Sequence, residues 1–121
     1  MAVILIVEDQ FMTREFAGIC VEDWGHRPLF AANVEEALGQ LRSGQEIDVL
    51  FTDIYLNGEV FGGCEIARQA QAMRPDLRVL YTTGNSLTAQ LKSQLVAGSH
   101  LLSKPYTPTQ LHTSVDATLA A

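Results

Sequence analysis

Short apolar runs alternate along the chain with longer segments in which apolar residues recur every three or four positions. The short runs predict strands, and the longer segments predict a helix after each strand. Strands are expected at residues 3–8, 27–32, 47–52, 78–83 and 99–103. Helices are expected at 10–24, from a cap at Asn33, at 63–74, at 86–96 and from a cap at Thr107. The pattern therefore predicts five successive strand–helix units.

Local signals support the predicted helix ends. Gly25 stands where the first helix should stop, because glycine tolerates the backbone turn that ends a helix. Asn33 precedes Glu36 by three residues, and Thr107 precedes Gln110 by three residues. This is the spacing of a capping box, in which each side chain satisfies a free backbone amide of the other residue.

Four of the predicted helices carry an apolar face that we expect to pack against a sheet. The expected inward residues are Met12, Phe16, Ile19, Cys20 and Trp24 in the first helix, Ile66, Ala67, Ala70 and Met73 in the third, Leu87, Leu91 and Leu95 in the fourth, and Leu111, Val115 and Leu119 in the last.

The alternation of strands and helices predicts the fold class. It favours a parallel sheet with right-handed crossovers. The predicted strands 3–8, 47–52 and 78–83 are apolar almost throughout, so helices should cover both faces of the sheet. Pro28 lies near the start of strand 27–32, which suits an edge strand. We therefore expect a doubly wound α/β fold of the (βα)5 type, with a five-stranded sheet.

Composition and charge restrict the function classes. An apolar share of 47% and a charged share of 18% suit one folded domain over residues 1–121. The net charge of −6 argues against nucleic-acid binding, which needs a basic surface. No apolar stretch approaches the roughly 20 residues of a membrane span, and the N-terminus does not resemble a secretory signal. Cys20 and Cys64 are widely spaced in apolar surroundings, so we expect reduced thiols in a cytoplasmic protein.

Polar side chains gather at the carboxyl ends of the predicted strands, which is where open parallel sheets bind ligands. They are Glu8 and Asp9 after the first strand, Asp53 after the third, Thr82, Thr83, Gly84 and Asn85 at the end of the fourth, and Ser103, Lys104 and Pro105 at the end of the fifth.

Three carboxylates on one edge of the sheet need compensating positive charge. Two carboxylates about 5 Å apart repel by roughly 3 kcal/mol at an effective dielectric constant near 20. Lys104 supplies one positive charge, and a divalent cation with oxygen ligands, such as Mg²⁺, would supply two more. Taken alone, Glu8 and Asp9 could cap a helix and Asp53 could be a solvated loop residue. Their joint placement at successive strand ends favours a metal and phosphate site.

These residues resemble the receiver domain of two-component response regulators over essentially the whole chain. The combination of "TTGN" with "SKPY" is similar to stand-alone, single-domain receivers of a kind common in alphaproteobacteria. The resemblance implies a flavodoxin-like fold with strand order 2-1-3-4-5. The residues that carry it are Glu8 and Asp9, Asp53 in "LFTDI", Thr83 in "YTTGN", and Lys104 and Pro105 in "SKPY".

The resemblance implies a phosphorylation site. Asp53 would accept a phosphoryl group from the phosphohistidine of a sensor histidine kinase or a phosphotransfer protein. Mg²⁺ would be held by Glu8, Asp9, Asp53 and the backbone carbonyl of Tyr55. Lys104 would pair first with Asp53 and then with the phosphoryl oxygens.

The resemblance also implies a switch. The hydroxyl of Thr83 would donate a hydrogen bond to a phosphoryl oxygen, and the Lys104–Pro105 peptide bond would be cis. Phosphorylation would then change the affinity for an unknown downstream protein. Core packing is the alternative role for most residues of the expected switch face, and a homodimer is left open. That face comprises Leu87, Leu91, Leu101, Tyr106 and Leu111.

The chain departs from the family pattern at several positions. Leu101 stands where receivers usually carry an aromatic residue, and Tyr106 is a candidate replacement. Leu56-Asn57 replaces the usual Met-Pro, and the glycines that follow predict a looser loop. Tyr55 and Asn85 occupy positions that tune dephosphorylation in the family.

Other function classes fit less well. A receiver-like interaction module that works without phosphorylation is the main alternative. A phosphatase with an aspartate nucleophile would need a second Asp at the position of Tyr55. A flavin carrier would need a phosphate-binding loop after the first strand, where the chain has the acidic "EDQFMT". His26, His100 and His112 are scattered and are expected at surface or packing positions.

Overall fold

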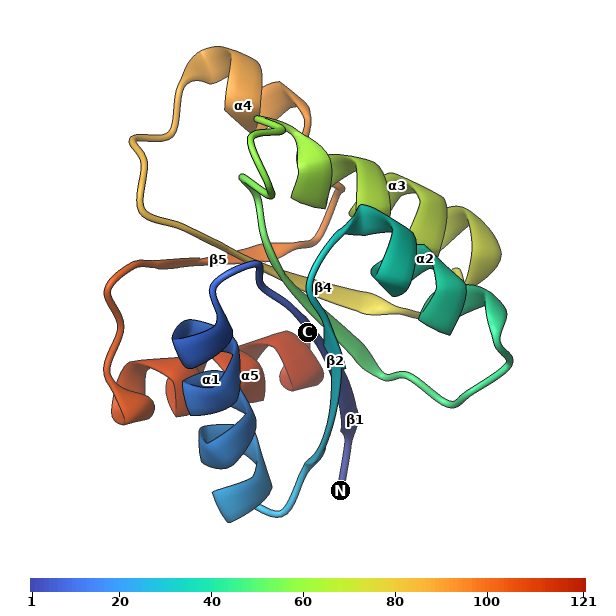
Figure 1. The fold of residues 1–121 in the computed structure, drawn as a ribbon, viewed down its shortest axis with the longest axis vertical. Helices are drawn as coiled ribbons and strands as arrows, with labels where there is room; N and C mark the ends of the chain where they lie inside the picture. The colour runs from blue at the N-terminus through green and yellow to red at the C-terminus, as the bar shows by residue number, and fades with distance from the viewer.

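The computed structural model describes residues 1–121 as a parallel five-stranded sheet with helices on both faces (Figure 1). The strand order is β2-β1-β3-β4-β5, so the predicted fold class and strand order are confirmed. The strands are β1 (Val3–Val7), β2 (Arg27–Ala31), β3 (Val49–Asp53), β4 (Arg78–Thr83) and β5 (His100–Ser103).

The helices form two layers. In Figure 1, α1 and α5 lie side by side on one face of the sheet, and α2 and α3 lie on the other face. The helices are α1 (Phe11–Asp23), α2 (Val34–Arg42), α3 (Gly62–Met73), α4 (Ala89–Ser93) and α5 (Pro108–Ala120).

The strands supply a separate core to each layer. Leu50 and Tyr81 belong to the core beneath α2, α3 and α4, whereas Phe51 and Leu80 belong to the core beneath α1 and α5. Successive strand residues point to opposite faces, so each apolar strand serves both cores. This is why the central strands are apolar almost throughout. At their carboxyl ends the alternation continues into polar residues, and this positions the site described below.

The predicted face of α1 is wrong in part. Met12 and Ile19 are mostly exposed, with 77% and 60% of their surface accessible. Ala17, Gly18 and Val21 are buried instead, and of the predicted residues Cys20 is confirmed as buried. The small residues allow close packing, since the ring of Phe30 lies against Gly18 where a Cβ atom would stand. The larger apolar side chains of α1 therefore form a neighbouring stripe on the surface.

The predicted fourth helix is too long. Helix α4 covers Ala89–Ser93 and not residues 86–96. The side chain of Thr88 accepts a hydrogen bond from the backbone amide of Leu91, so the helix is capped at this point. After Ser93 the chain continues in tighter turns, because the amide of Gln94 donates to the carbonyl of Leu91. The position of Leu91 in the core is confirmed.

Other local predictions are confirmed. Asn33 caps α2 and Thr107 opens α5 with a capping box. Leu111 and Val115 of α5 are buried as predicted, whereas the inward position predicted for Met73 of α3 is wrong, since Met73 is 38% exposed. Both cysteines are buried free thiols. The histidines occupy packing or surface positions; the imidazole of His112, for example, stacks on Trp24.

Candidate functional site

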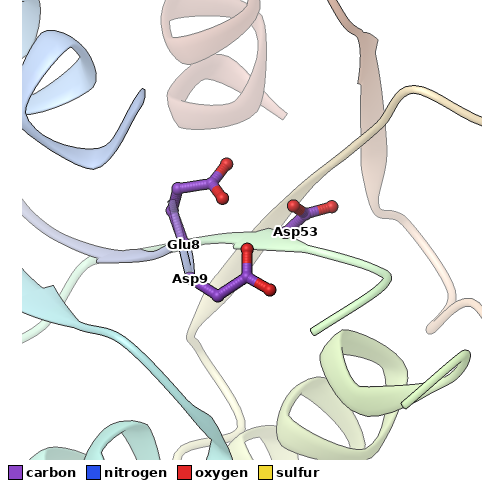
Figure 2. Close-up of side chains that lie close together, drawn as sticks. All are labelled: Glu8, Asp9 and Asp53. Atoms are coloured by element: carbon purple, nitrogen blue, oxygen red, sulfur yellow. The ribbon is translucent and has the colours of Figure 1, made fainter. Parts of the chain in front are cut away.

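The carboxyl ends of β1 and β3 bring three carboxylates together. Glu8 and Asp9 follow β1, and Asp53 is the last residue of β3. Figure 2 shows the three side chains converging on one space. Each offers a carboxylate oxygen, and these oxygens all lie within 4.8 Å of one another. The parallel pairing of β1 with β3 fixes this proximity, since both strands end at the same edge.

Lys104 neutralises part of this negative charge. Its Nζ atom lies 2.7 Å from Oδ2 of Asp53 and 2.5 Å from Oε1 of Glu8. Glu8 and Asp53 are buried, and the side chain of Lys104 is 22% exposed. Such charge-assisted hydrogen bonds are stronger when water is largely excluded. Three carboxylates and one ammonium group nevertheless leave two uncompensated negative charges, which is what one divalent cation would neutralise.

The carboxylates differ in their protonation equilibria. Burial raises the pKa of Glu8 and of Asp53, and hydrogen bonds from Lys104 offset only part of that effect. Burial also acts to raise the pKa of Asp9, but the amide of Asn57 and other donors outweigh it and lower the pKa overall. Burial acts to lower the pKa of Lys104, yet its bonds to Asp53 and Glu8 raise it on balance. Lys104 is therefore held in its charged form.

A tight turn after β3 holds Asp9 in place. Leu56 and Glu59 exchange backbone hydrogen bonds of 3.1 and 2.8 Å, and the two residues between them, Asn57 and Gly58, both have positive φ angles of 50° and 83°. This is the geometry of a two-residue hairpin turn that Asn-Gly favours. The amide of Asn57 donates to Oδ2 of Asp9 at 2.9 Å.

The side chain of Asn57 adds a second tie, because Nδ2 donates to the carbonyl of Ala32 at 3.1 Å. The turn and these two bonds tie the loop to the rest of the fold, and its predicted looseness stays a prediction. Sequence reasoning missed the role of Asn57, although the Asn57-Gly58 pair was a signal for the turn.

Close packing of α3 fixes the backbone of Asp53. A Cβ atom on Gly63 would lie only 2.0 Å from the carbonyl oxygen of Asp53. Position 63 must therefore be glycine for α3 to begin so near the end of β3. The amide of Gly63 also donates to the carbonyl of Ile54 at 2.9 Å.

Comparison with known proteins identifies the family. The sequence model of the response regulator receiver domain matches residues 4–116. The chain belongs to the response regulator receiver domain family. This receiver is therefore a protein of two-component signalling, as the resemblance implied.

Solved receiver structures share its fold. A response regulator receiver protein from Sinorhizobium medicae WSM419 is 28% identical, with a TM-score of 0.89 over 99% of this chain and 95% of that chain. A CheY-like receiver domain protein from Methanospirillum hungatei JF-1 is 24% identical, with a TM-score of 0.88 over 99% and 94% of the two chains. NtrX from Brucella abortus is 23% identical, with a TM-score of 0.86, over 98% of this chain and 27% of that chain. At this identity the last two show the shared fold alone.

Thr83 ends β4 of the receiver, and Lys104 directly follows the adjacent strand β5. Thr83 is buried at the end of β4, and its Oγ1 accepts a hydrogen bond of 3.1 Å from the amide of Asn85. The Lys104–Pro105 peptide bond is cis. Tyr55 is 42% exposed.

The residues of the expected switch face do not share one surface. Leu91 and Leu111 are buried in the two different cores. Tyr106 packs near Phe16 and Phe51, with ring centroids 6.1 and 6.0 Å apart, on the side of the sheet that α1 covers. Leu101 is 37% exposed. Tyr106 and Leu101 thus lie in different environments.

An apolar groove borders the site of the receiver. It has a volume of about 590 Å³. Its walls include Met12, Phe16 and Tyr106, and Lys104 lines it as well.

None of the helices combines the length and apolar character that a bilayer crossing requires.

Proposed function

We propose that Asp53 of this receiver accepts a phosphoryl group from the phosphohistidine of a sensor histidine kinase or a phosphotransfer protein. The observation that carries the proposal is the pairing of Lys104 with Asp53 at 2.7 Å beside two further carboxylates. A carboxylate that is mostly ionised at neutral pH is already a competent nucleophile. Membership of the receiver family supports this choice of chemistry.

The residues present fit a Mg²⁺ ion. Glu8, Asp9 and Asp53 offer hard oxygen ligands within 4.8 Å of one another, and the carbonyl of Tyr55 would complete the protein ligands. Mg²⁺ favours such oxygen ligands and keeps several water molecules. When bound, it would supply positive charge to the phosphoryl oxygens during transfer.

The transfer needs positioning more than covalent activation. One carboxylate oxygen of Asp53 forms a bond to phosphorus while the P–N bond of the donor phosphohistidine breaks, and the electron pair of that bond returns to the imidazole ring. Lys104 then pairs with a phosphoryl oxygen, and Glu8 keeps the ammonium group close through its 2.5 Å contact. The rigid backbone of Asp53, packed against Gly63, aims the carboxylate.

Thr83 provides the link to an output. Its oxygen accepts a hydrogen bond from the amide of Asn85, and its O–H group is the donor that a charged phosphoryl oxygen would attract. Turning this hydroxyl toward the phosphoryl group would favour a different arrangement of the loop after β4. Such a population shift would change the affinity for a downstream protein.

Intact-mass measurement tests the proposal. The receiver is incubated with Mg²⁺ and a small acyl phosphate donor. We expect a gain of about 80 Da, the mass of one phosphoryl group, in the wild type and in Asp76→Asn. Asp76 is an exposed residue after α3, so this control changes the same charge away from the site.

Asp53→Asn should show no gain in mass. An unchanged mass of the wild type would contradict the proposal and would favour an interaction module that works without phosphorylation. A gain that persists in Asp53→Asn would place the acceptor elsewhere.

A further inference from the structure

Two hydroxyl groups of β4 hold the two ends of the connection between β4 and β5. Tyr81 and Thr83 are two residues apart and so lie on the same face of the strand. Thr83 accepts a hydrogen bond from the amide of Asn85, at the start of the connection. The hydroxyl of Tyr81 accepts a hydrogen bond of 3.1 Å from the amide of Val96, near its end.

The side chain of Tyr81, which accepts this hydrogen bond, lies in the interior of the protein. This side chain is completely buried, in the same core as Leu91 of α4. Leu87, Leu95 and Val96 pack against that core from the connection. Burial raises the pKa of Tyr81 to about 12, so the phenol is neutral at physiological pH and can accept the hydrogen bond of Val96 without carrying charge.

The far part of the connection has few other polar ties to the rest of the fold. Helix α4 is only five residues long. The turns that follow it use local backbone bonds, such as that from the amide of Leu95 to the carbonyl of Lys92 at 3.3 Å. Arg68 of α3 reaches Gln94, but this contact is exposed and 3.4 Å long. A hydrogen bond to a buried acceptor such as the hydroxyl of Tyr81 contributes more in such a segment than an exposed one.

We propose that Tyr81 is a positioning residue that anchors residues 94–99 to β4 and confines the phosphorylation response to the near part of the connection, residues 84–88. The proposal rests on the function proposed above, in which the phosphoryl group recruits Thr83. When Thr83 releases the amide of Asn85, the bond between Tyr81 and Val96 is unaffected. The surface that changes for a partner is therefore the loop directly after β4. Leu101, which pairs with Tyr81 across the sheet, keeps its place.

Amide hydrogen exchange tests the anchor in the unphosphorylated receiver. Tyr81→Phe removes one hydroxyl and keeps the buried ring. We expect exchange at Val96 to be about five- to tenfold faster than in the wild type, because its amide loses a buried acceptor. Tyr106→Phe removes a hydroxyl on the opposite face of the sheet and should leave exchange at Val96 unchanged. Equal rates at Val96 in the wild type and in Tyr81→Phe would overturn the anchor.

The same measurement on the phosphorylated receiver tests the confinement. In the wild type, exchange should change at residues 84–88 and stay constant at 94–99, whereas in Tyr81→Phe it should change in both parts. If phosphorylation changed amide exchange at residues 94–99 as strongly in the wild type as in Tyr81→Phe, the proposed confinement would be overturned. Failure of Asp53 to take up a phosphoryl group would instead overturn the proposed function and the confinement with it, while the comparison at Val96 would still decide the anchor.

Discussion

The backbone amide of Asn57 donates a hydrogen bond of 2.9 Å to Oδ2 of Asp9. The two residues are 48 positions apart in the sequence, and the bond joins the loop after β3 to the acidic end of β1. It orients one of the three carboxylates before any ligand arrives. A metal site whose ligands are held in advance loses less entropy on binding.

The turn that carries Asn57 should therefore affect metal affinity. Gly58→Ala forces a residue with a Cβ atom into the left-handed region, where Gly58 has φ of 83°. We expect a loss of stability of about 1–2 kcal/mol and a several-fold weaker affinity for Mg²⁺, measured by thermal melting and titration calorimetry.

Gly44→Ala is the matched control for this prediction. Gly44 has a similar φ of 82° and open space around its Cα atom, but it lies after α2 and away from the carboxylates. We expect a similar loss of stability with unchanged Mg²⁺ affinity. If both variants bound Mg²⁺ as the wild type does, the turn would have no part in orienting Asp9.

Asp53 and Asp9 should have opposite effects on stability in the absence of metal. The pKa of Asp53 is raised above its ordinary value of 3.8, mainly by burial. Its contribution to stability is therefore present at acidic pH and is lost as pH rises through the raised pKa. Asp53→Asn should stabilise the fold at pH 7, by on the order of 1 kcal/mol, and the gain should shrink as the pH falls toward 4.

Asp9→Asn provides the contrast. The pKa of Asp9 is lowered, so its contribution is present at neutral pH and is lost when acid protonates the carboxylate. The side chain is partly exposed, and we expect Asp9→Asn to lose only a few tenths of a kcal/mol at pH 7. Denaturant unfolding with a chelator present, over a range of pH, measures both effects. If Asp53→Asn and Asp9→Asn changed the free energy of unfolding in the same direction at pH 7, the result would contradict this charge distribution.

Mg²⁺ should stabilise the receiver. A ligand that binds only the folded state at a concentration 100 times its dissociation constant adds about 2.7 kcal/mol. Bound metal requires ionised carboxylates, and the raised pKa values of Glu8 and Asp53 mean that affinity should begin to fall at a higher pH than ordinary carboxylates would give. Thermal melting with and without Mg²⁺ checks this.

Asp9→Asn should remove most of that stabilisation, whereas Asp76→Asn, with the same loss of charge at an exposed position, should retain it. A Mg²⁺ effect that survives in Asp9→Asn would show that the ion binds elsewhere.

The alternation of strands and helices predicted the (βα)5 sheet and the meeting of Asp53 with Lys104 at its edge, whereas the strand order came from the resemblance to receiver domains. Strand residues alternate between two buried faces, so a continuous apolar run that ends on a carboxylate indicates a central strand with its polar end at the sheet edge. The loop around Asn57 was harder to predict. Its hydrogen bond to Asp9 depends on a partner 48 residues away, which local composition does not indicate.

Helix α1 shows a second limit. Two stripes at helical spacing lie side by side, one with Met12 and Phe16 and the other with Ala17 and Val21. Side-chain size favoured the first stripe, but the smaller residues are the ones buried, since they let the helix approach the sheet closely. Residue size alone does not decide which stripe packs inward when the contact is close.

Chemical trapping of the phosphorylated residue tests the central claim most directly. Reduction with borohydride converts an aspartyl phosphate, but not a free carboxylate, to homoserine, and peptide mass spectrometry then locates the change. After treatment with an acyl phosphate donor and Mg²⁺, we expect homoserine at position 53, with little conversion when the metal is chelated. Reduction of Glu8 or Asp9 to the corresponding alcohol in place of Asp53, or no reduction at any of the three, would contradict the account.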